Sequence, residues 1–374
     1  MRGFKNVGIA INARFLTQRL TGVQRHAIET VRALDALLAE RSADTRPDVE
    51  LIVPGGHAWH HGPLSVIRVR VAGRLSGHLW EQLALPFLAG RRVLLNLCNT
   101  FPLLAWRPVV TVHDASIYAM PEGYTAAFVR LYRLLFAALR LRRQVTVMTD
   151  SRFSANELAR YVGLPRSRLN VVYCGADHWQ RVVPDDGVVR HLGLERGRYV
   201  LGVASENPNK NLHRLVTAFD LAFESCDTAF RPRLVLVGGR NARVFAGVEA
   251  RPDPEWMVRA GPVSDAELAG LYRGATCFAF PSLYEGFGLP PLEAMQFGCP
   301  VLSSREASLP EVCGDAALYC DGRDEDDIAR AMRVLVNDAS MRDRLTALGH
   351  QQVARFRWRE TARQVLAFVE EAAA

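Results

Sequence analysis

The chain lacks the features of a disulfide-stabilised or membrane-spanning protein. Its seven cysteines form no Cys-x-x-Cys pair and lie mostly in apolar, strand-like runs, so we expect buried free thiols rather than disulfides or a cysteine metal site. The longest apolar region, Val93–Val112, is interrupted by asparagine, proline and arginine, whereas a spanning helix needs about 20 apolar residues. Met1–Asn6 is polar and basic, unlike a secretory signal peptide. We therefore expect a cytoplasmic chain without a membrane span.

The remaining composition is that of a globular protein with an uneven charge. Hydrophobic residues make up 49% and charged residues 23% of 374 residues, a length that favours two domains. Residues 1–180 hold 23 Lys and Arg against 12 Asp and Glu, a net charge of +11, and the rest of the chain has a net charge of −4. The basic half predicts an anionic partner, either a membrane face or a phosphate-bearing substrate. No recognition motif for nucleic acid is present.

Short β-branched runs alternate with longer helical patterns, which is typical of parallel sheets with helices on both faces. The rhythm breaks between Cys174 and Arg198, where glycine, proline and aspartate gather. We predict an α/β protein with two doubly wound, Rossmann-like domains facing across a cleft: residues 1–180, a linker at 181–197, residues 198–356, and a closing helix at 357–374. The expected buried strands are Val7–Asn12, Glu50–Val53, Val66–Val71, Val109–Val112, Val145–Thr149, Leu169–Tyr173, Tyr199–Val203, Leu234–Val237, Cys277–Phe280 and Val301–Ser303.

One segment joins a strand end, a glycine-bearing loop and a helix start, and it reads Phe280-Pro-Ser-Leu-Tyr-Glu-Gly-Phe-Gly-Leu-Pro-Pro-Leu-Glu-Ala-Met. Gly286 and Gly288 let a ligand approach the backbone, and the following helix N-terminus offers free N–H groups to a diphosphate. Glu285, before the loop, and Glu293, in the first helical turn, can accept hydrogen bonds from sugar and ribose hydroxyls. The alternative is that Glu293 complements the helix dipole and Glu285 is a solvated loop residue.

The same segment carries a family resemblance. Together with Gly298-Cys-Pro-Val, Ser308-Leu-Pro-Glu-Val and Gly314-Asp-Ala-Ala, it resembles the retaining glycosyltransferases of family 4. The resemblance extends over nearly the whole chain and is densest across residues 199–321. It implies the GT-B fold, with an acceptor-side first domain and a second domain that binds the nucleotide sugar. This form of the motif resembles mannosyl- and rhamnosyltransferases of bacterial surface polysaccharide assembly.

The resemblance also implies which residues form the site. Thr21-Gly-Val-Gln-Arg resembles the family's N-terminal glycine loop, which reaches the donor diphosphate, and Gly22 also opens a helix. His113 resembles the family's sugar-facing histidine, with a structural histidine as the alternative. Val263 lies in a loop that resembles the one holding the nucleotide base, although a helix cap would explain that loop equally well. The expected catalytic residues are His113, Lys210 and Glu285, and the expected donor-binding residues are Gly22, Val263, Gly286, Phe287, Gly288, Leu289 and Glu293.

One loop departs from the family pattern. Family members usually place an arginine and a lysine after the first strand of the second domain, where they clamp the diphosphate. Here the loop is Ala204-Ser-Glu-Asn-Pro-Asn-Lys-Asn-Leu, so Lys210 is in register but Asn209 occupies the arginine position. A bidentate cation is missing. Arg25 and Arg214 are candidates to compensate for it.

No pattern predicts a metal site or a cofactor other than the nucleotide-sugar substrate. Asp324-Glu-Asp-Asp could be taken for the metal-binding Asp-x-Asp of the other large glycosyltransferase fold, but it directly precedes an apolar helical pattern and indicates acidic helix capping. His57, His60 and His61 lie in a glycine-rich loop without a fourth ligand at zinc-like spacing.

The segment Tyr124–Arg143 predicts an amphipathic helix. Its polar face is basic, and the face opposite is apolar. The arginines are Arg130, Arg133, Arg140 and Arg143, and the apolar residues are Phe128, Leu131, Leu135 and Leu139. The basic face is either solvated or rests on anionic lipid. The closing helix, which begins at Arg357 and resembles the family's last helix, would add three more basic residues.

These observations predict a retaining, metal-independent glycosyltransferase. We expect it to move a hexose, namely mannose from GDP-mannose, onto a polyprenyl-diphosphate-linked saccharide in bacterial surface polysaccharide synthesis. We expect it to be peripheral on the inner face of the cell membrane. The alternatives are a sugar-nucleotide epimerase of the same fold, a catalytically inactive nucleotide-sugar-binding protein, and a soluble sugar as the acceptor.

Overall fold

The computed structural model describes residues 8–203, 207–227, 231–239 and 253–373. The segment Met1–Asn6, the expected strand start at Val7 and residues 204–206 of the departing loop lie outside the described residues. The chain divides into two compact units, one running to Gly175 and including the residues from Arg357 onward, and the other comprising Ala176–Phe356. Each unit is described by itself.

The described residues of the first unit form a seven-stranded parallel sheet in the order β3-β2-β1-β4-β5-β6-β7. The central strands are buried along their whole length, as expected for parallel strands covered by helices on both faces. At the edge, β3 is largely exposed, so the expectation of a buried strand there is wrong: a sheet edge has a neighbour on one side only. The strands are β1 Ile9–Asn12, β2 Val49–Pro54, β3 Arg68–Ala72, β4 Val93–Asn96, β5 Arg107–Thr111, β6 Thr146–Thr149 and β7 Leu169–Val171.

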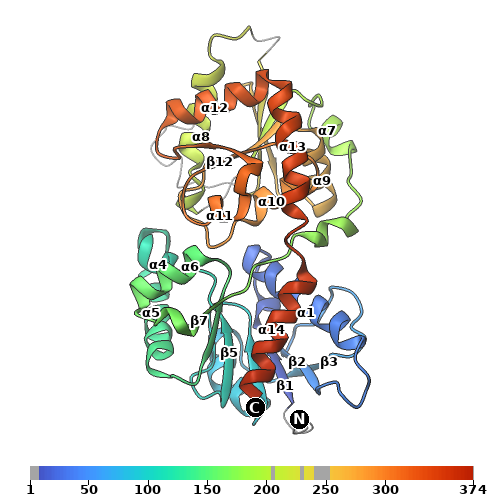
Figure 1. Cartoon of the computed structure of the whole chain (residues 1–374), viewed down its shortest axis with the longest axis vertical. Helices are drawn as coiled ribbons and strands as arrows, with labels where there is room; N and C mark the ends of the chain where they lie inside the picture. The colour runs from blue at the N-terminus through green and yellow to red at the C-terminus, as the bar shows by residue number, and fades with distance from the viewer. Residues whose placement is uncertain (1–7, 204–206, 228–230, 240–252, 374) are drawn as a thin grey trace. The chain divides into compact units, whose positions relative to one another are not determined.

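Helices cover both faces of this sheet. The first begins at Gly22, as predicted, behind a capping box formed by Thr21 and Gln24. The closing helix α14 lies beside α1 (Figure 1) and contributes Val365 and Leu366 to the core of the first unit. The helices are α1 Gly22–Ala39, α2 Gly77–Leu79, α3 Leu85–Ala89, α4 Ser116–Ala119, α5 Ala126–Leu141, α6 Arg152–Glu157 and α14 Trp358–Ala373, with π-helical turns at Trp80–Ala84 and Leu158–Val162.

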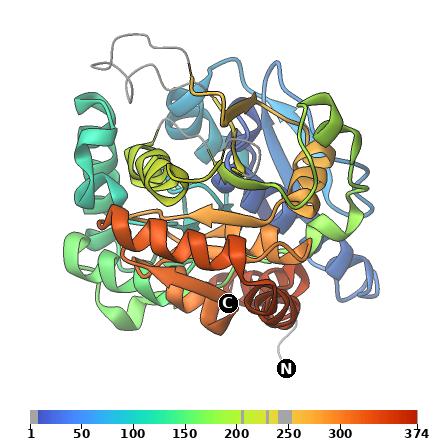
Figure 2. The ribbon, with the colours of Figure 1, turned by 90° about the horizontal axis from the view of Figure 1, so that it is seen from above.

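The described residues of the second unit form a six-stranded parallel sheet in the order β10-β9-β8-β11-β12-β13. Helices α8 and α12 lie side by side against it (Figure 2). The strands are β8 Tyr199–Val203, β9 Arg233–Val237, β10 Met257–Gly261, β11 Cys277–Phe280, β12 Val301–Ser304 and β13 Ala317–Cys320. The helices are α7 Gly187–His191, α8 Leu212–Phe223, α9 Asp265–Gly274, α10 Leu289–Gln296, α11 Leu309–Cys313, α12 Glu325–Asn337 and α13 Ala339–Val353.

The segment predicted as a linker belongs to the second unit, which corrects the expected boundary at 181–197. Val188 and Val189 are buried, and the Asp185 N–H donates to the Ala266 carbonyl at 2.8 Å. A methyl group on Gly270 would lie 2.1 Å from the Asp185 carbonyl oxygen, so the two segments are in close contact. Glycine and proline mark the turns of this segment, but its two valines anchor it to α9.

Two smaller expectations can be compared with the structure. Asp324 caps α12 by accepting from the backbone N–H groups of Asp326 and Asp327, which confirms the helix-capping interpretation. The cysteines are free thiols, but Cys98 is half-buried and Cys226 is exposed, so the expectation of burial is wrong for those two. Among the described residues, no helix is long and apolar enough to cross a bilayer.

Candidate active site

The carboxyl ends of β8 and β11 mark the point where the strand order of the second sheet reverses. The chain leaves β8 toward β9 on one side and reaches β11 on the other, so the segments after these two strands diverge. Ligands in doubly wound sheets bind at such a switch point. Lys210 follows β8 and Glu285 follows β11. Two of the three predicted catalytic residues therefore lie at this switch point.

Lys210 and Glu285 form an ion pair there. The Lys210 Nζ lies 2.7 Å from Glu285 Oε1, and the side chains are 17% and 11% exposed. Ser282 Oγ donates to the same carboxylate oxygen at 2.6 Å, and the ammonium group also stands 4.9 Å from the centre of the Phe280 ring. The pair is thus held in a fixed position, mostly out of water, with its charges facing each other.

The side chain of Asn209 is buried and holds the two loops together. Its Nδ2 donates to the Tyr284 carbonyl at 2.6 Å, while the backbone carbonyl of Asn209 accepts from the Leu283 N–H at 2.7 Å and lies 2.8 Å from Ser282 Oγ. Asn211, in the left-handed conformation at φ 58°, donates to the carbonyl groups of residues 281 and 322. In this chain, Asn209 therefore serves to join the loops, and its amide does not replace a cation.

The glycine loop leads into α10 as the sequence predicts. Gly288 has φ +108°, a left-handed conformation that favours glycine, and Leu289 begins the helix with two prolines directly after it. Ser308, which directly precedes α11, also holds the loop in place. Its Oγ lies 2.9 Å from the Glu285 carbonyl oxygen and 2.7 Å from that of Phe287, so the two carbonyls share its one hydroxyl proton. Because α10 begins at Leu289, Glu293 lies in the second turn, which corrects the expected first-turn position.

Two further predicted donor residues are Glu293, on α10, and Val263, in the loop between β10 and α9. Glu293 Oε2 accepts a long, 3.4 Å hydrogen bond from the buried Tyr272 hydroxyl, and burial followed by the Glu293 charge raises the pKa of Tyr272 well above its ordinary value. Val263 is half-buried between β10 and the capping box of Ser264 and Glu267 that opens α9. The capping interpretation of that loop is confirmed, and its contact with a base stays a prediction.

In the first unit, His113 has both ring nitrogens engaged. It lies two residues beyond β5 and is 4% exposed. Its Nδ1 is 2.5 Å from Asp150 Oδ2 and its Nε2 is 2.9 Å from the Leu97 carbonyl oxygen. A carbonyl only accepts and an ionised carboxylate only accepts, so both nitrogens donate and the ring is an imidazolium. Burial opposes that charge, but the Asp150 carboxylate raises the pKa of His113 well above its ordinary value.

This arrangement differs from the contact that the sequence predicts for His113. With one N–H directed to Asp150 and the other to Leu97, neither nitrogen is left for a hydroxyl of the donor sugar. The positive charge is nevertheless close to the first turns of α1, because the His113 ring lies edge-on to that of His26, with 4.9 Å between centroids. The sugar contact of His113 stays a prediction that requires one of these hydrogen bonds to be exchanged.

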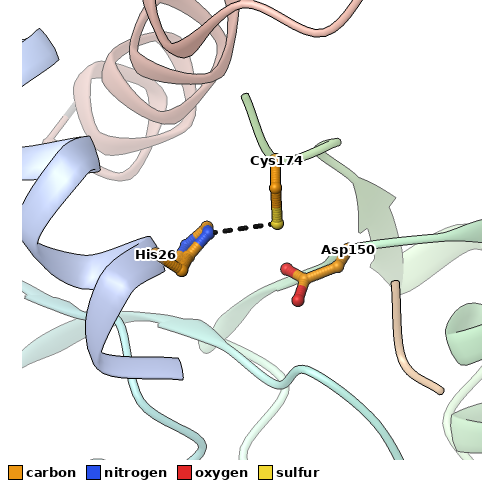
Figure 3. Close-up of side chains that lie close together, drawn as sticks. All are labelled: His26, Asp150 and Cys174. Carbon is orange, nitrogen blue, oxygen red and sulfur yellow. Dashed lines mark hydrogen bonds between the residues drawn. The ribbon is translucent and has the colours of Figure 1, made fainter. Parts of the chain in front are cut away.

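Figure 3 shows three buried side chains that lie close together: His26 from α1, Asp150 after β6 and Cys174 after β7. Their potential ligand atoms lie within 4.8 Å of one another, a spacing that could hold a metal ion. Cys174 Sγ is 3.4 Å from His26 Nδ1. Burial lowers the pKa of His26 to about 4 and raises that of the Cys174 thiol, so both are neutral at pH 7. A metal would have to displace the thiol proton and compete with His113 for Asp150.

Comparisons with known proteins address the same features. The family profile described as "Glycosyl transferases group 1" matches residues 190–352, which include the Lys210–Glu285 pair and α10. The O-antigen chain mannosyltransferase B of Escherichia coli is 34% identical over 267 residues, which cover 70% of this chain and 69% of that protein. The chain belongs to the group 1 glycosyl transferases.

This glycosyltransferase is also similar to a longer relative and to solved structures. The serotype-specific mannosyltransferase WbdA of Escherichia coli is 28% identical over 270 residues, which cover 69% of this chain but 32% of that protein. The chain thus spans about a third of that relative's length. The sucrose-phosphate synthase of Thermosynechococcus elongatus has a TM-score of 0.74 at 18% identity, covering 98% of this chain and 99% of that one. The GT-B fold predicted from the sequence is confirmed.

Several residues that shape the site were not selected from the sequence. Ser282 and Ser308 fix the glycine loop, and Asp150 determines the protonation of His113. Serines in loops carry no distinctive local pattern. Asp150 stands at the end of a strand in the first domain, as His113 does, and that shared position was the available signal.

Proposed function

We propose that this glycosyltransferase is a retaining enzyme that moves mannose from GDP-mannose onto a lipid-linked saccharide. The observation that carries the proposal is the Lys210–Glu285 ion pair beside the N-terminus of α10, at the switch point of the second sheet. Support for mannose comes from the names of two relatives, the O-antigen chain mannosyltransferase B and the serotype-specific mannosyltransferase WbdA.

In this proposal the donor occupies the position between the two charges. The diphosphate accepts hydrogen bonds from Lys210 and from the backbone of residues 286–289 at the start of α10, where the helix dipole favours an anion. Lys210 then turns from Glu285 toward the phosphate, and Glu285 accepts from hydroxyl groups of the sugar. Glu293 accepts from the ribose, and Gly22, at the start of α1 in the first unit, stays a proposed donor-binding residue.

The chemical step is front-side transfer with retention. The acceptor oxygen bonds to the anomeric carbon on the face from which the diphosphate departs, and the bond between that carbon and the diphosphate oxygen breaks. The acceptor proton passes to the departing diphosphate. The protein contributes position and charge stabilisation, chiefly through Lys210 and the α10 backbone, while His113 adds a fixed positive charge on the first unit.

A single incubation separates the possible activities. The protein is mixed with labelled GDP-mannose and either a polyprenyl-diphosphate-linked saccharide or a soluble saccharide. New labelled glycolipid with an α-anomeric product from the α-linked donor supports the proposal. An altered sugar on the nucleotide would identify an epimerase, unchanged donor a binding protein, and product on the soluble saccharide alone a soluble acceptor.

The base of the donor is the least constrained part of the proposal, because residues near Val263 would hold it through backbone groups. Calorimetry with GDP, UDP and dTDP compares the bases without the sugar. We expect GDP to bind most tightly. Tighter binding of UDP or dTDP would overturn the choice of GDP-mannose.

The lipid-linked acceptor is proposed from the positive charge of the first unit. Ion pairs within that unit reduce the number of arginines available to attract an anionic membrane. Arg359 of the closing helix pairs with Glu40, and Arg363 pairs with Glu360. The expectation that this helix adds three basic residues is therefore corrected, because two of them are neutralised. The arginines of α5 remain the source of attraction, and we expect sedimentation with anionic vesicles that weakens as salt screens it.

A further inference from the structure

An exposed apolar surface covers one side of the first unit, and we call it the apolar face. Eight of the fifteen large apolar side chains that are exposed among the described residues belong to it. Its members come from three segments: the α2–α3 stretch, the loop before β5, and α5. They are Leu79, Leu83, Phe87, Leu103, Leu104, Trp106, Leu134 and Leu141. Phe87 is 78%, Leu104 70% and Leu141 81% exposed, so these side chains stand almost fully in solvent.

The three segments are neighbours, so their exposed apolar side chains lie on adjoining parts of the first unit. Gln82 accepts from the Leu103 N–H and donates to the Phe101 carbonyl, which fastens the loop to the π-helical turn. Arg142, next to the end of α5, donates to the carbonyl groups of Leu103 and Ala105. The α2 and α5 helices also meet, because the rings of His78 and Tyr132 are edge-on with 6.2 Å between centroids.

The pattern along the α2–α3 stretch is that of an interfacial helix. Leu79, Leu83 and Phe87 recur every four residues on the exposed side, while Trp80 and Leu85 are buried beneath them. Exposed apolar side chains at this spacing are unusual on a protein surface and indicate a binding face.

The exposed charged side chains on these segments are all basic. On the exposed side of α5, Arg130, Arg133 and Arg140 alternate with Leu134 and Leu141. Arginine also stands at positions 91, 142 and 143, and the guanidinium of Arg91 lies 5.4 Å from the centre of the Trp106 ring. Across residues 77–89, 101–106 and 126–143 the one acidic residue is Glu81, which is buried.

We infer that the apolar face inserts into the interfacial region of an anionic lipid bilayer. The arginines meet the lipid phosphates, while Phe87, Leu104, Trp106 and the leucines enter the boundary between headgroups and chains. A second copy of this chain fits the face less well, because two such surfaces would bring six arginines against six others, with no exposed carboxylate on these segments to offset them. The inference rests on the proposed lipid-linked acceptor for its purpose, but the binding it describes does not require catalysis.

This geometry changes the expected salt response. Attachment through arginines alone would disappear in high salt, whereas inserted apolar side chains hold protein after the charges are screened. We expect the full chain to bind phosphatidylglycerol-containing vesicles at least tenfold better than pure phosphatidylcholine vesicles at low salt, and to retain a measurable fraction on them in high salt.

Three variants test the face by vesicle sedimentation. Phe87→Ser/Leu104→Ser/Trp106→Ser removes apolar side chains that are exposed, so the fold should remain intact, and we expect at least a tenfold loss of binding with no high-salt fraction. Arg130→Gln/Arg133→Gln/Arg140→Gln should lose the preference for anionic lipid. The matched control, Val183→Ser/Val334→Ser, removes exposed apolar residues of the second unit and should bind as the unchanged protein does.

A spectroscopic readout locates the insertion. Trp106 is 55% exposed, and brominated lipid should quench its fluorescence in bound protein, with the quenching lost in Trp106→Phe. Equal vesicle binding by the serine triple variant and the control would overturn the inference, as would absence of binding by the unchanged protein. A dimer that the triple variant converts to monomer, without vesicle binding, would assign the face to a second copy. GDP calorimetry on the same samples distinguishes a failure of the proposed function from a failure of the apolar face to bind membranes.

Discussion

The Lys210–Glu285 pair gives the sharpest test of the site. Lys210→Met keeps the length of the side chain and removes its charge, so Glu285 Oε1 loses its ion pair and keeps the hydrogen bond from Ser282. Removing one partner of a buried pair costs about 3–5 kcal/mol, and because these side chains are 17% and 11% exposed we expect the lower end, about 3 kcal/mol. Glu285→Gln should cost less, because Lys210 keeps its position over the Phe280 ring.

Activity and stability should respond differently in this series. Each single variant loses a group that we propose acts on the donor, so we expect transfer to fall by about 10²–10³ in each. The double variant should be less destabilised than the sum of the two singles, with a coupling of about 1–3 kcal/mol, because the partners contact each other.

The assay is a double-mutant cycle of urea unfolding, with label transfer measured on the same four proteins. Arg330→Met is the matched control, because Arg330 pairs with Asp327 on the surface of the same unit and should leave unfolding and transfer unchanged. Transfer close to that of the unchanged protein in either single variant would refute the assignment. Additive destabilisation would show that the two charges do not interact in solution.

Three further expectations follow from contacts in the two units. Asn209→Ala should cost about 1–3 kcal/mol in urea unfolding, because the Tyr284 carbonyl loses its donor, and an unchanged midpoint would contradict this role. His26 has a pKa of about 4 in the fold, below its ordinary 6.5, so the unfolded chain binds the extra proton first and stability should fall by up to about 3 kcal/mol as pH drops from 6.5 to 4. In His26→Gln that acid loss should be smaller by this amount, measured by unfolding at several pH values, and an identical pH profile would argue against burial of the neutral ring. Gly175→Ala places a methyl group 2.3 Å from the Trp358 backbone nitrogen, and we expect a lower melting temperature by calorimetry and loosened packing of α14, whereas normal melting would show that the contact can adjust.

Local patterns were sufficient for much of the fold. Alternating apolar runs identified the central strands of both sheets, and the capping signals at Gly22, Ser264 and Asp324 correspond to observed helix starts. The sequence did not identify β4, β10 or β13. β4 was hidden in a longer apolar region, β13 is only partly buried, and β10 is largely half-buried at the edge of its sheet. An edge strand pairs with a single neighbour, which is often distant in the sequence. Its own residues therefore show a less regular apolar pattern than those of a central strand.

What the sequence determined by itself is the local structure of the segment that we propose binds the donor. The glycine conformation at Gly288, the helix start at Leu289 and the placement of Glu285 before them depend on residues within a few positions of one another. Dihedral preference and capping are local properties, so the order of residues decides them. Lys210, in the adjacent loop, was identified by the resemblance to family 4 and not by such local preferences.

Only the tertiary structure decided which partners these residues have. Lys210 Nζ and Glu285 Oε1 are 2.7 Å apart although the residues are separated by 75 positions in the sequence. The buried side chain of Asn209 donates to the Tyr284 carbonyl. His113 donates one N–H group to Asp150 and the other to the Leu97 carbonyl. The apolar face likewise consists of three segments that are separated in the sequence, and the apolar pattern of each one does not show that they are neighbours in the fold. Burial and pairing of a polar group depend on everything packed around it, and that surrounding is assembled from distant parts of the chain.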